Sequence, residues 1–191
     1  MEHRLGIGPE QHSRGGFDVQ PPQHVIACLI EDRPDQRGGR LLVGAGTVLT
    51  GAQAESAIRA GADFLVSPHF DPALVRLAQE NGLPFVPGVM SPTEVASALA
   101  MGLRILKLFP AGSLGPGYVK DLLGPFADAK LLCTGGIKPA DAPSYVRAGA
   151  VGVGLGSALL HMPDAEAGRW EPIARNARAL LESVRAAKSA S

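Results

Sequence analysis

One lysine stands where its amine could act as a nucleophile. Lys107 lies within the apolar segment Ile105–Phe109 and is followed closely by Pro110. Lysine is seldom buried without a reason, and burial lowers the pKa of an amine from its ordinary value of about 10.4. A neutral amine can attack a carbonyl carbon and form a Schiff base. The sequence therefore predicts a Schiff-base lysine, with one alternative: a structural lysine that reaches solvent or pairs with a carboxylate.

Two glycine-rich segments could hold a phosphate group. Gly135 and Gly136 follow one apolar run, and Gly156 and Ser157 follow the next apolar run along the chain. Glycine has no side chain, so the backbone N–H groups of such a segment can approach an anion closely. We predict a phosphate-binding site here. The alternative is a pair of tight turns.

A repeat of strands and helices must position these residues. Apolar runs recur about every twenty residues, at 41–43, 64–66, 84–86, 105–109, 131–133 and 151–153. Helix-like stretches lie between them, and several end on a glycine suited to a helix C-terminus, at Gly61, Gly82, Gly102 and Gly149. Asp71-Pro72 and Ser91-Pro92 predict helix starts. Alternating strands and helices indicate βα units around a parallel sheet.

The short, regular period favours a (β/α)8 TIM-type barrel over an open doubly wound sheet. We predict one domain over residues 1–191, with six βα units in residues 40–160. The active site of such a barrel lies at the carboxyl ends of its strands, and the loops after the last two strands commonly bind phosphate. Both Lys107 and the glycine segments occupy such positions.

The two ends of the chain follow other patterns. Residues 1–39 form an atypical N-terminal segment, rich in glycine and proline, in which only His24–Ile30 is strand-like. The first two βα units are therefore expected to be incomplete or irregular. Residues 161–191 are predicted to form a loop and an amphipathic closing helix, frayed over Lys188–Ser191.

Composition limits the function classes. The chain has 18 Lys and Arg against 18 Asp and Glu, and this balance argues against a partner bound through many phosphates, such as nucleic acid. Its two cysteines make no disulfide framework, which is typical of a reducing cytoplasm. The sequence shows no metal-ligand spacing and no long apolar segment that would span a membrane. We expect no metal.

Other residues have weaker signals. Thr47, after Gly44-Ala45-Gly46, could lie beneath a substrate or belong to a close-packed turn. His69 either contacts substrate or is an exposed loop residue, and Cys133 is expected to be a small core residue. The remaining histidines are predicted to be incidental; they are His3, His12, His24 and His161.

Several motifs together resemble the class I aldolases that act on 2-keto-3-deoxy-6-phosphogluconate and 2-keto-3-deoxy-6-phosphogalactonate. The resemblance covers residues 40 to about 185 and is carried by VGAGTVLT, FLVSPHFDPALVRLA, PGVMSPTE, LKLFPAGSLGPGYVKDL, TGGIKP and GLGSALL. LKLFP with SLGPGYVK and GLGSALL are more similar to the phosphogalactonate branch. TGGI is more similar to the phosphogluconate branch.

This resemblance implies an activity and a set of site residues. Lys107 would form a Schiff base with the C2 carbonyl of the sugar acid, and cleavage between C3 and C4 would yield pyruvate and glyceraldehyde 3-phosphate without a cofactor. The implied phosphate-binding residues are Gly135, Gly136, Gly156 and Ser157. Thr47, Pro87 and Thr134 would line the pyruvate end of the site. Relatives are commonly trimers, which implies a homotrimer.

The N-terminal segment departs from this resemblance. Family members carry an arginine-containing strand end and then a catalytic glutamate, but VQPPQHVIACLIEDRPDQRGG stands in place of these motifs. Glu31 and Asp32 lie in a different context, so the role of the glutamate is not assigned to them. Our hypothesis is that residues 1–39 are wholly or partly translated from a shifted reading frame.

Two other functions are compatible with these motifs. The first is a non-catalytic or impaired phosphate-binding homologue that lacks the glutamate. The second is another phosphate-handling barrel enzyme, an isomerase or synthase of tryptophan or thiamine metabolism, which would share the loop glycines without requiring Lys107.

Overall fold

Eight short strands form the inner layer of the part of the chain that the structure describes. The computed structural model describes residues 24–28 and 42–189. Its strands are β1 (His24–Cys28), β2 (Leu42–Gly46), β3 (Leu65–Val66), β4 (Phe85–Val86), β5 (Gly88–Val89), β6 (Ile105–Leu108), β7 (Lys130–Thr134) and β8 (Gly152–Gly154). They form two sheets, ordered β1-β2-β3-β4 and β5-β6-β7-β8. Every pairing from β2 onward is parallel, as the βα repeat predicts.

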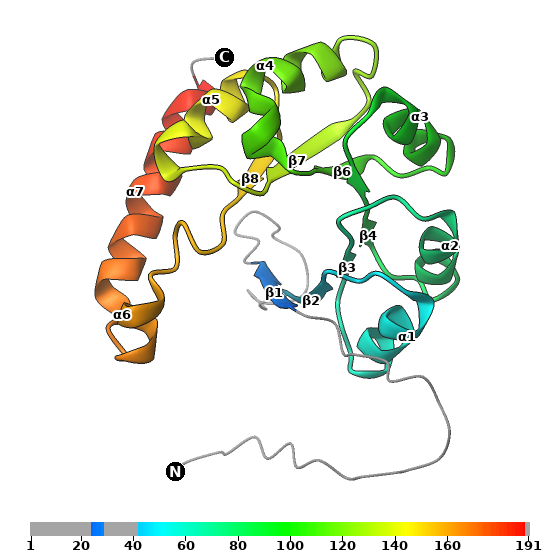
Figure 1. Ribbon diagram of the computed structural model, residues 1–191, viewed down its shortest axis with the longest axis horizontal. Helices are drawn as coiled ribbons and strands as arrows, with labels where there is room; N and C mark the ends of the chain where they lie inside the picture. The colour runs from blue at the N-terminus through cyan, green and yellow to red at the C-terminus, as the bar shows by residue number, and fades with distance from the viewer. Residues whose placement is uncertain (1–23, 29–41, 190–191) are drawn as a thin grey trace, which may run out of the picture.

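The helices lie outside the strands and form an incomplete ring around them (Figure 1). They are α1 (Gly51–Arg59), α2 (Pro72–Glu80), α3 (Pro92–Ala100), α4 (Ala111–Leu123), α5 (Ala142–Arg147), α6 (Met162–Glu166) and α7 (Trp170–Ser189), with a short 3-10 turn at Pro139–Asp141. This arrangement is the α/β barrel architecture expected from the sequence. No helix within the described residues combines the length and apolarity needed to cross a bilayer.

Pro87 separates β4 from β5 without separating the two sheets. Proline has no N–H group, so it interrupts the hydrogen-bond ladder. The carbonyl of Val86 still accepts a hydrogen bond from Ser67 N–H on one side. On the other side the carbonyl of Pro87 accepts one from Lys107 N–H, at 2.8 Å. Residues 85–89 therefore join the two sheets into one inner layer.

Side chains alternate between the two faces of this layer. On β6 and β7 the residues that point toward the helices are fully buried: Leu106, Leu108, Leu131 and Cys133. The alternate residues point to the inner face of the arc, where Ile105 is 49% exposed and Lys107 is half-buried. The apolar core thus lies between strands and helices, and the inner face is left for chemistry.

The predicted helix starts and ends are confirmed. The Asp71 carboxylate accepts a hydrogen bond from Ala73 N–H at the start of α2, and Ser91 and Glu94 form a reciprocal capping box at the start of α3. The glycines predicted to end helices have left-handed backbone angles: Gly61, Gly82, Gly102 and Gly149. These local signals set the ends of the helices, as expected.

Three features differ from the sequence prediction. The strand β1 runs antiparallel to β2, whereas every strand of a regular barrel is parallel. Helix α6 lies where a loop was predicted, whereas α4 lies where the six βα units require a helix, although Gly115 and Pro116 interrupt its pattern. Helix α7 continues to Ser189, so predicted fraying at Lys188 is wrong.

Much of the atypical N-terminal segment lies outside the described residues. Only His24–Cys28 of residues 1–39 is described, and that strand coincides with the strand-like stretch expected there. His3, His12, Glu31 and Asp32 lie outside the described residues, as do the last two residues of the chain.

Candidate active site

Lys107 occupies the inner face of β6, near the carboxyl end of the strand. It pairs with Gly88 on β5 and with Leu132 on β7, so strands flank it on both sides. Its own N–H donates to the Pro87 carbonyl. These backbone bonds fix the position of Lys107, as predicted from its place in an apolar strand.

The environment of the Lys107 amine favours its neutral form. Nζ lies 4.8 Å from the centroid of the Phe109 ring. Contact with the ring favours the ammonium modestly, whereas removal from water disfavours it. Burial prevails and lowers the pKa of Lys107 below the ordinary value for lysine. A larger share of the amine is therefore available as a nucleophile.

The glycine segment after β7 is held against the loop that follows Lys107. Gly135 and Gly136 have φ values of 86° and 73°, which glycine adopts without strain. Gly112 N–H donates to the Gly135 carbonyl at 2.7 Å. A Cβ at Gly112 would lie 2.3 Å from the Gly136 carbonyl oxygen, so this close approach requires a glycine.

The second glycine segment begins beside the first. Thr134 at the end of β7 pairs with Gly154 at the end of β8, so both segments leave the sheet at its carboxyl edge. Gly156 and Ser157 are exposed, and the Gly156 carbonyl accepts hydrogen bonds from Leu159 and Leu160 N–H. The residues therefore form a turn whose backbone is accessible to a ligand.

The Thr134 hydroxyl is buried and has no hydrogen-bond partner among the described residues. Thr134 alternates with the helix-facing Cys133 and thus belongs to the inner face, as Lys107 does. A buried hydroxyl without a partner costs about 1–3 kcal/mol, so it is a natural contact for a polar ligand atom.

The other residues implied for the pyruvate end have different surroundings. Pro87 is fully buried and touches the Lys107 backbone through its carbonyl. Thr47 follows β2 with a left-handed φ of 59° and lies at the same carboxyl edge of the sheet. Thr47 and Lys107 therefore both lie at the carboxyl ends of their strands, Thr47 after β2 and Lys107 near the end of β6.

The remaining candidates contact other residues of the chain. Cys133 is fully buried, and burial raises the pKa of its thiol to about 12, as befits a core residue. His161 Nδ1 lies 2.9 Å from the Asp164 carboxylate at the start of α6. His69 Nδ1 lies 2.9 Å from the hydroxyl of the buried Ser67. The described part of the chain contains no cluster of three metal-binding side chains.

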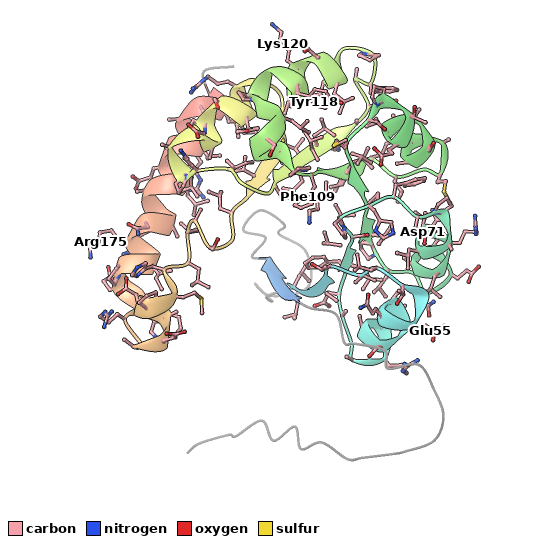
Figure 2. All side chains as sticks on the ribbon, viewed as in Figure 1. Glu55, Asp71, Phe109, Tyr118, Lys120 and Arg175 are labelled. Carbon is pink, nitrogen blue, oxygen red and sulfur yellow. The ribbon has the colours of Figure 1, made fainter. Side chains whose placement is uncertain are left out.

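The apolar sequence around Lys107 already implied that Phe109 helps to desolvate the amine, but sequence reasoning missed its contact with Gly135. Figure 2 shows Phe109 on the inner side of the arc of strands. Its ring lies over the Lys107 amine and also touches Gly135. The available signal was the spacing of two residues, because Phe109 directly follows β6 and residues two apart in extended chain share a face.

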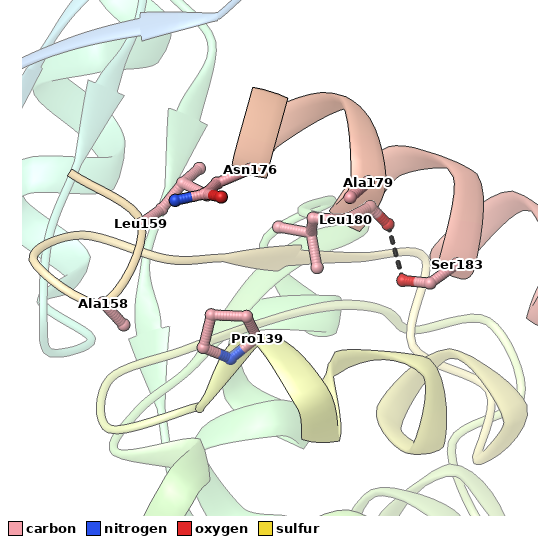
Figure 3. A pocket seen from close by; sticks show the side chains of 7 residues that line it. All are labelled: Pro139, Ala158, Leu159, Asn176, Ala179, Leu180 and Ser183. Atoms are coloured by element: carbon pink, nitrogen blue, oxygen red, sulfur yellow. Dashed lines mark hydrogen bonds between the residues drawn. The ribbon is translucent and has the colours of Figure 1, made fainter. Parts of the chain in front are cut away.

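A separate cavity of about 300 Å³ lies between α7 and the segments that follow β7 and β8 (Figure 3). Its lining residues are Pro139, Ala158, Leu159, Asn176, Ala179, Leu180 and Ser183. Ser183 donates its hydroxyl to the Leu180 carbonyl within this lining. The cavity borders the segment after Ser157, and Lys107 is not part of its lining.

The fold and site define an α/β barrel protein with a partly desolvated lysine beside two glycine segments at the carboxyl edge of its strands. Comparisons with known proteins agree with this class. The sequence profile described as KDPG and KHG aldolase matches residues 17–176. The chain belongs to this aldolase family. The match begins before residue 40, earlier than the sequence motifs indicated.

Individual relatives have related activities. The 2-dehydro-3-deoxy-phosphogluconate aldolase of Haemophilus influenzae is 35% identical over 170 residues, covering 88% of this chain and 78% of that protein. The 2-dehydro-3-deoxy-6-phosphogalactonate aldolase of Escherichia coli is 36% identical over 126 residues. That alignment covers 65% of this chain and 62% of the E. coli protein, so it spans less than two thirds of the relative.

Solved structures share the fold. A KDPG aldolase from Legionella pneumophila, with pyruvate captured as a covalent carbinolamine intermediate, has a TM-score of 0.67 and 32% identity. The alignment covers 72% of this chain and 67% of that one. A native KDPGal structure has a TM-score of 0.66 and 32% identity, with 74% of this chain and 69% of that chain covered.

Proposed function

We propose that this chain is a class I aldehyde-lyase that cleaves a 2-keto-3-deoxy-6-phospho sugar acid to pyruvate and glyceraldehyde 3-phosphate. The observation that carries the proposal is the partly desolvated Lys107 amine on the inner face of β6, beside the Gly135-Gly136 segment. Membership in the aldolase family supports the same reaction.

Lys107 is the proposed nucleophile. Its neutral amine attacks the C2 carbonyl carbon, and loss of water from the carbinolamine leaves an iminium ion. The C4 hydroxyl then loses its proton, the C3–C4 bond breaks, and its electron pair moves toward the iminium to form an enamine. Glyceraldehyde 3-phosphate departs, C3 takes up a proton, and water hydrolyses the iminium to release pyruvate and the free amine.

The two ends of the substrate are assigned to different elements. The proposed phosphate ligands are the backbone groups of Gly135, Gly136 and Gly156, with the Ser157 hydroxyl. The unpartnered Thr134 hydroxyl supports a polar contact with the reacting carbons. Thr47 and Pro87 are proposed to line the pyruvate end. No residue is assigned as the general base.

Reductive trapping tests this function. Borohydride added with pyruvate should reduce the imine and leave a stable adduct, which peptide mapping should locate at Lys107. Lys130, exposed at the amino end of β7, serves as an internal control because it lies on the same sheet at the opposite edge. An adduct mainly at Lys120, Lys130 or Lys138, or none from folded protein, would contradict the assignment.

A second candidate function is an impaired phosphate-binding homologue. The antiparallel β1 favours it, because β1 borders β2 where a regular barrel would have a parallel strand. Such a protein would bind phosphorylated sugar acids without cleaving them. A coupled assay for pyruvate release, run beside a binding measurement, separates the two functions.

The finer properties of the enzyme are also proposals. The motifs near Lys107 support a preference for the phosphogalactonate epimer, which parallel assays of the two epimers would test. We propose a single domain, a homotrimer and a cytoplasmic location. A single cooperative unfolding transition and light scattering would test the first two, and fractionation of cells would test the third.

A further inference from the structure

Phe109 lies between two parts of the candidate site. Lys107 Nζ lies 4.8 Å from the centroid of its ring. On another side the ring meets the backbone of Gly135: a Cβ placed there would lie 2.6 Å from ring carbon Cε2 and 2.7 Å from Cδ2. One side chain therefore contacts both the amine and the glycine segment.

Hydrogen bonds hold these contacts in place. Gly112, three residues after Phe109, donates its N–H to the Gly135 carbonyl at 2.7 Å. The Tyr145 hydroxyl, on the buried side of α5, donates to the Ala111 carbonyl at 3.0 Å. The segment from Phe109 to Gly112 is thus fixed from both β7 and α5. Phe109 is 36% exposed, so part of the residue faces solvent and the rest contacts its neighbours.

We propose that Phe109 is a positioning residue for two parts of the site: the Schiff-base lysine, Lys107, and the Gly135-Gly136 segment proposed to bind phosphate, hereafter the phosphate segment. The inference rests on the proposed function, which assigns Lys107 as the nucleophile and the Gly135-Gly136 segment as a phosphate ligand. The ring keeps water from one side of the Lys107 amine. It also fills the space next to Gly135, so that the Gly135-Gly136 segment cannot shift toward the inner face of the strands. Loss of the ring should therefore weaken imine formation and phosphate binding together.

Three variants distinguish the ring from general packing. Phe109→Leu keeps an apolar side chain but removes the aromatic face, and Phe109→Tyr keeps the ring. Phe126→Leu is the control, because Phe126 is a partly buried ring that packs on the core cluster of Leu106, Leu108 and Leu131, in the connection before the amino end of β7. It lies at the edge of the sheet opposite the candidate site.

Two measurements report on the two parts separately. Pyruvate trapping by borohydride at Lys107 reports on the amine and requires no phosphate. Calorimetric titration with glycerol 3-phosphate, which has no carbonyl group, reports on the phosphate segment. We expect Phe109→Leu to slow trapping and to weaken glycerol 3-phosphate binding by about tenfold each. Phe109→Tyr should restore both to within about twofold, and Phe126→Leu should change neither while lowering the melting temperature.

Each outcome decides the inference. It is overturned if Phe109→Leu affects only one of the two measurements, if Phe109→Tyr restores neither, or if Phe126→Leu has the same effect. If the wild-type chain traps no pyruvate at Lys107, the proposed function fails and this inference fails with it. If the wild-type chain traps pyruvate and the variants behave otherwise than expected, only the inference fails.

Discussion

The two sheets of the molecule contribute unequally to the candidate site, because Lys107 and both glycine segments belong to or follow strands of the β5–β8 sheet. In the β5–β8 sheet, β6 and β7 pair over four successive residues, and the loops that follow them are joined by the Gly112–Gly135 hydrogen bond. In the β1–β4 sheet, β3 and β4 each contain two residues, and β1 is antiparallel. The longest parallel pairing thus coincides with Lys107 and the glycine segments, whereas the five-residue pairing of β1 with β2 is antiparallel.

Each sheet has a core of its own. Leu106, Leu108 and Leu131 belong to one buried cluster, and Leu65 and Leu74 belong to another. A disturbance in one cluster should therefore affect stability more than it affects the chemistry assigned to the other sheet. The following predictions separate chemistry from stability within the β5–β8 sheet and its cluster, from the largest expected effect to the smallest.

Replacing Lys107 should abolish the reaction. Lys107→Met keeps an unbranched side chain but removes the amine, and we expect cleavage to fall by about a thousandfold or more. The pyruvate adduct should disappear from peptide maps. Lys130→Met is the control and should retain activity, because Lys130 is exposed at the other edge of the sheet. Equal loss in both variants would contradict the role of Lys107.

A negative charge in the phosphate segment should weaken binding. Gly136→Asp places a carboxylate beside the bound phosphate, and we expect a loss of at least about 1.4 kcal/mol, or tenfold, in the affinity for glycerol 3-phosphate. Gly136→Ala is the control for backbone strain, since both residues must adopt a φ of 73°. Calorimetric affinities that are equal for the two variants would place the phosphate elsewhere.

The rate of pyruvate trapping should rise with pH through the lowered pKa of Lys107. Only the neutral amine attacks the carbonyl. Because burial lowers the pKa of Lys107, the neutral amine forms at a lower pH than in an ordinary lysine. Stability should change in the same direction. The folded chain binds fewer protons than the unfolded chain between the lowered and the ordinary pKa, so the free energy of unfolding increases with pH there.

The variant Lys107→Met separates this effect from other titrations. Its free energy of unfolding should rise less steeply with pH over the same window when both proteins are measured by urea denaturation. A trapping rate whose midpoint coincides with that of free lysine would show that the amine is fully hydrated.

Removing the cap of α3 should affect stability with little effect on chemistry. Ser91→Ala should lower the free energy of unfolding by about 1 kcal/mol, because Ser91 and Glu94 cap the helix reciprocally. Burial tends to raise the pKa of Glu94, but hydrogen bonds from Ser91 and Met90 outweigh it and lower the pKa. The contribution of this carboxylate is therefore present above the ordinary glutamate pKa and is lost as pH falls through the lowered value.

Urea denaturation at neutral and acidic pH measures the effect of this cap. The difference between wild type and Ser91→Ala should shrink at acidic pH, while pyruvate trapping at neutral pH should stay within about twofold of wild type. A large loss of trapping would show that the start of α3 contributes to the site directly.

The strand and helix pattern was readable from sequence because its signals are local. Proline after Asp71 or Ser91 marks a helix start, and a glycine such as Gly82 permits the left-handed ending. Helix α4 was predicted only as part of the βα repeat, since Gly115 and Pro116 break its own helical periodicity. The direction of β1 depends on pairing with β2, which no local pattern specifies.

The sequence by itself determined that a lysine would stand in an apolar strand, that glycines would follow the next two strands, and that βα units would bring both to one edge. These follow from periodicity and from residue type. Only the tertiary structure decided that the Phe109 ring would lie over Lys107 and against Gly135, and that Gly112 would bond to Gly135. The contacts of Gly135 with Phe109 and Gly112 join segments distant in sequence, so their distances depend on how neighbouring strands pair and helices pack.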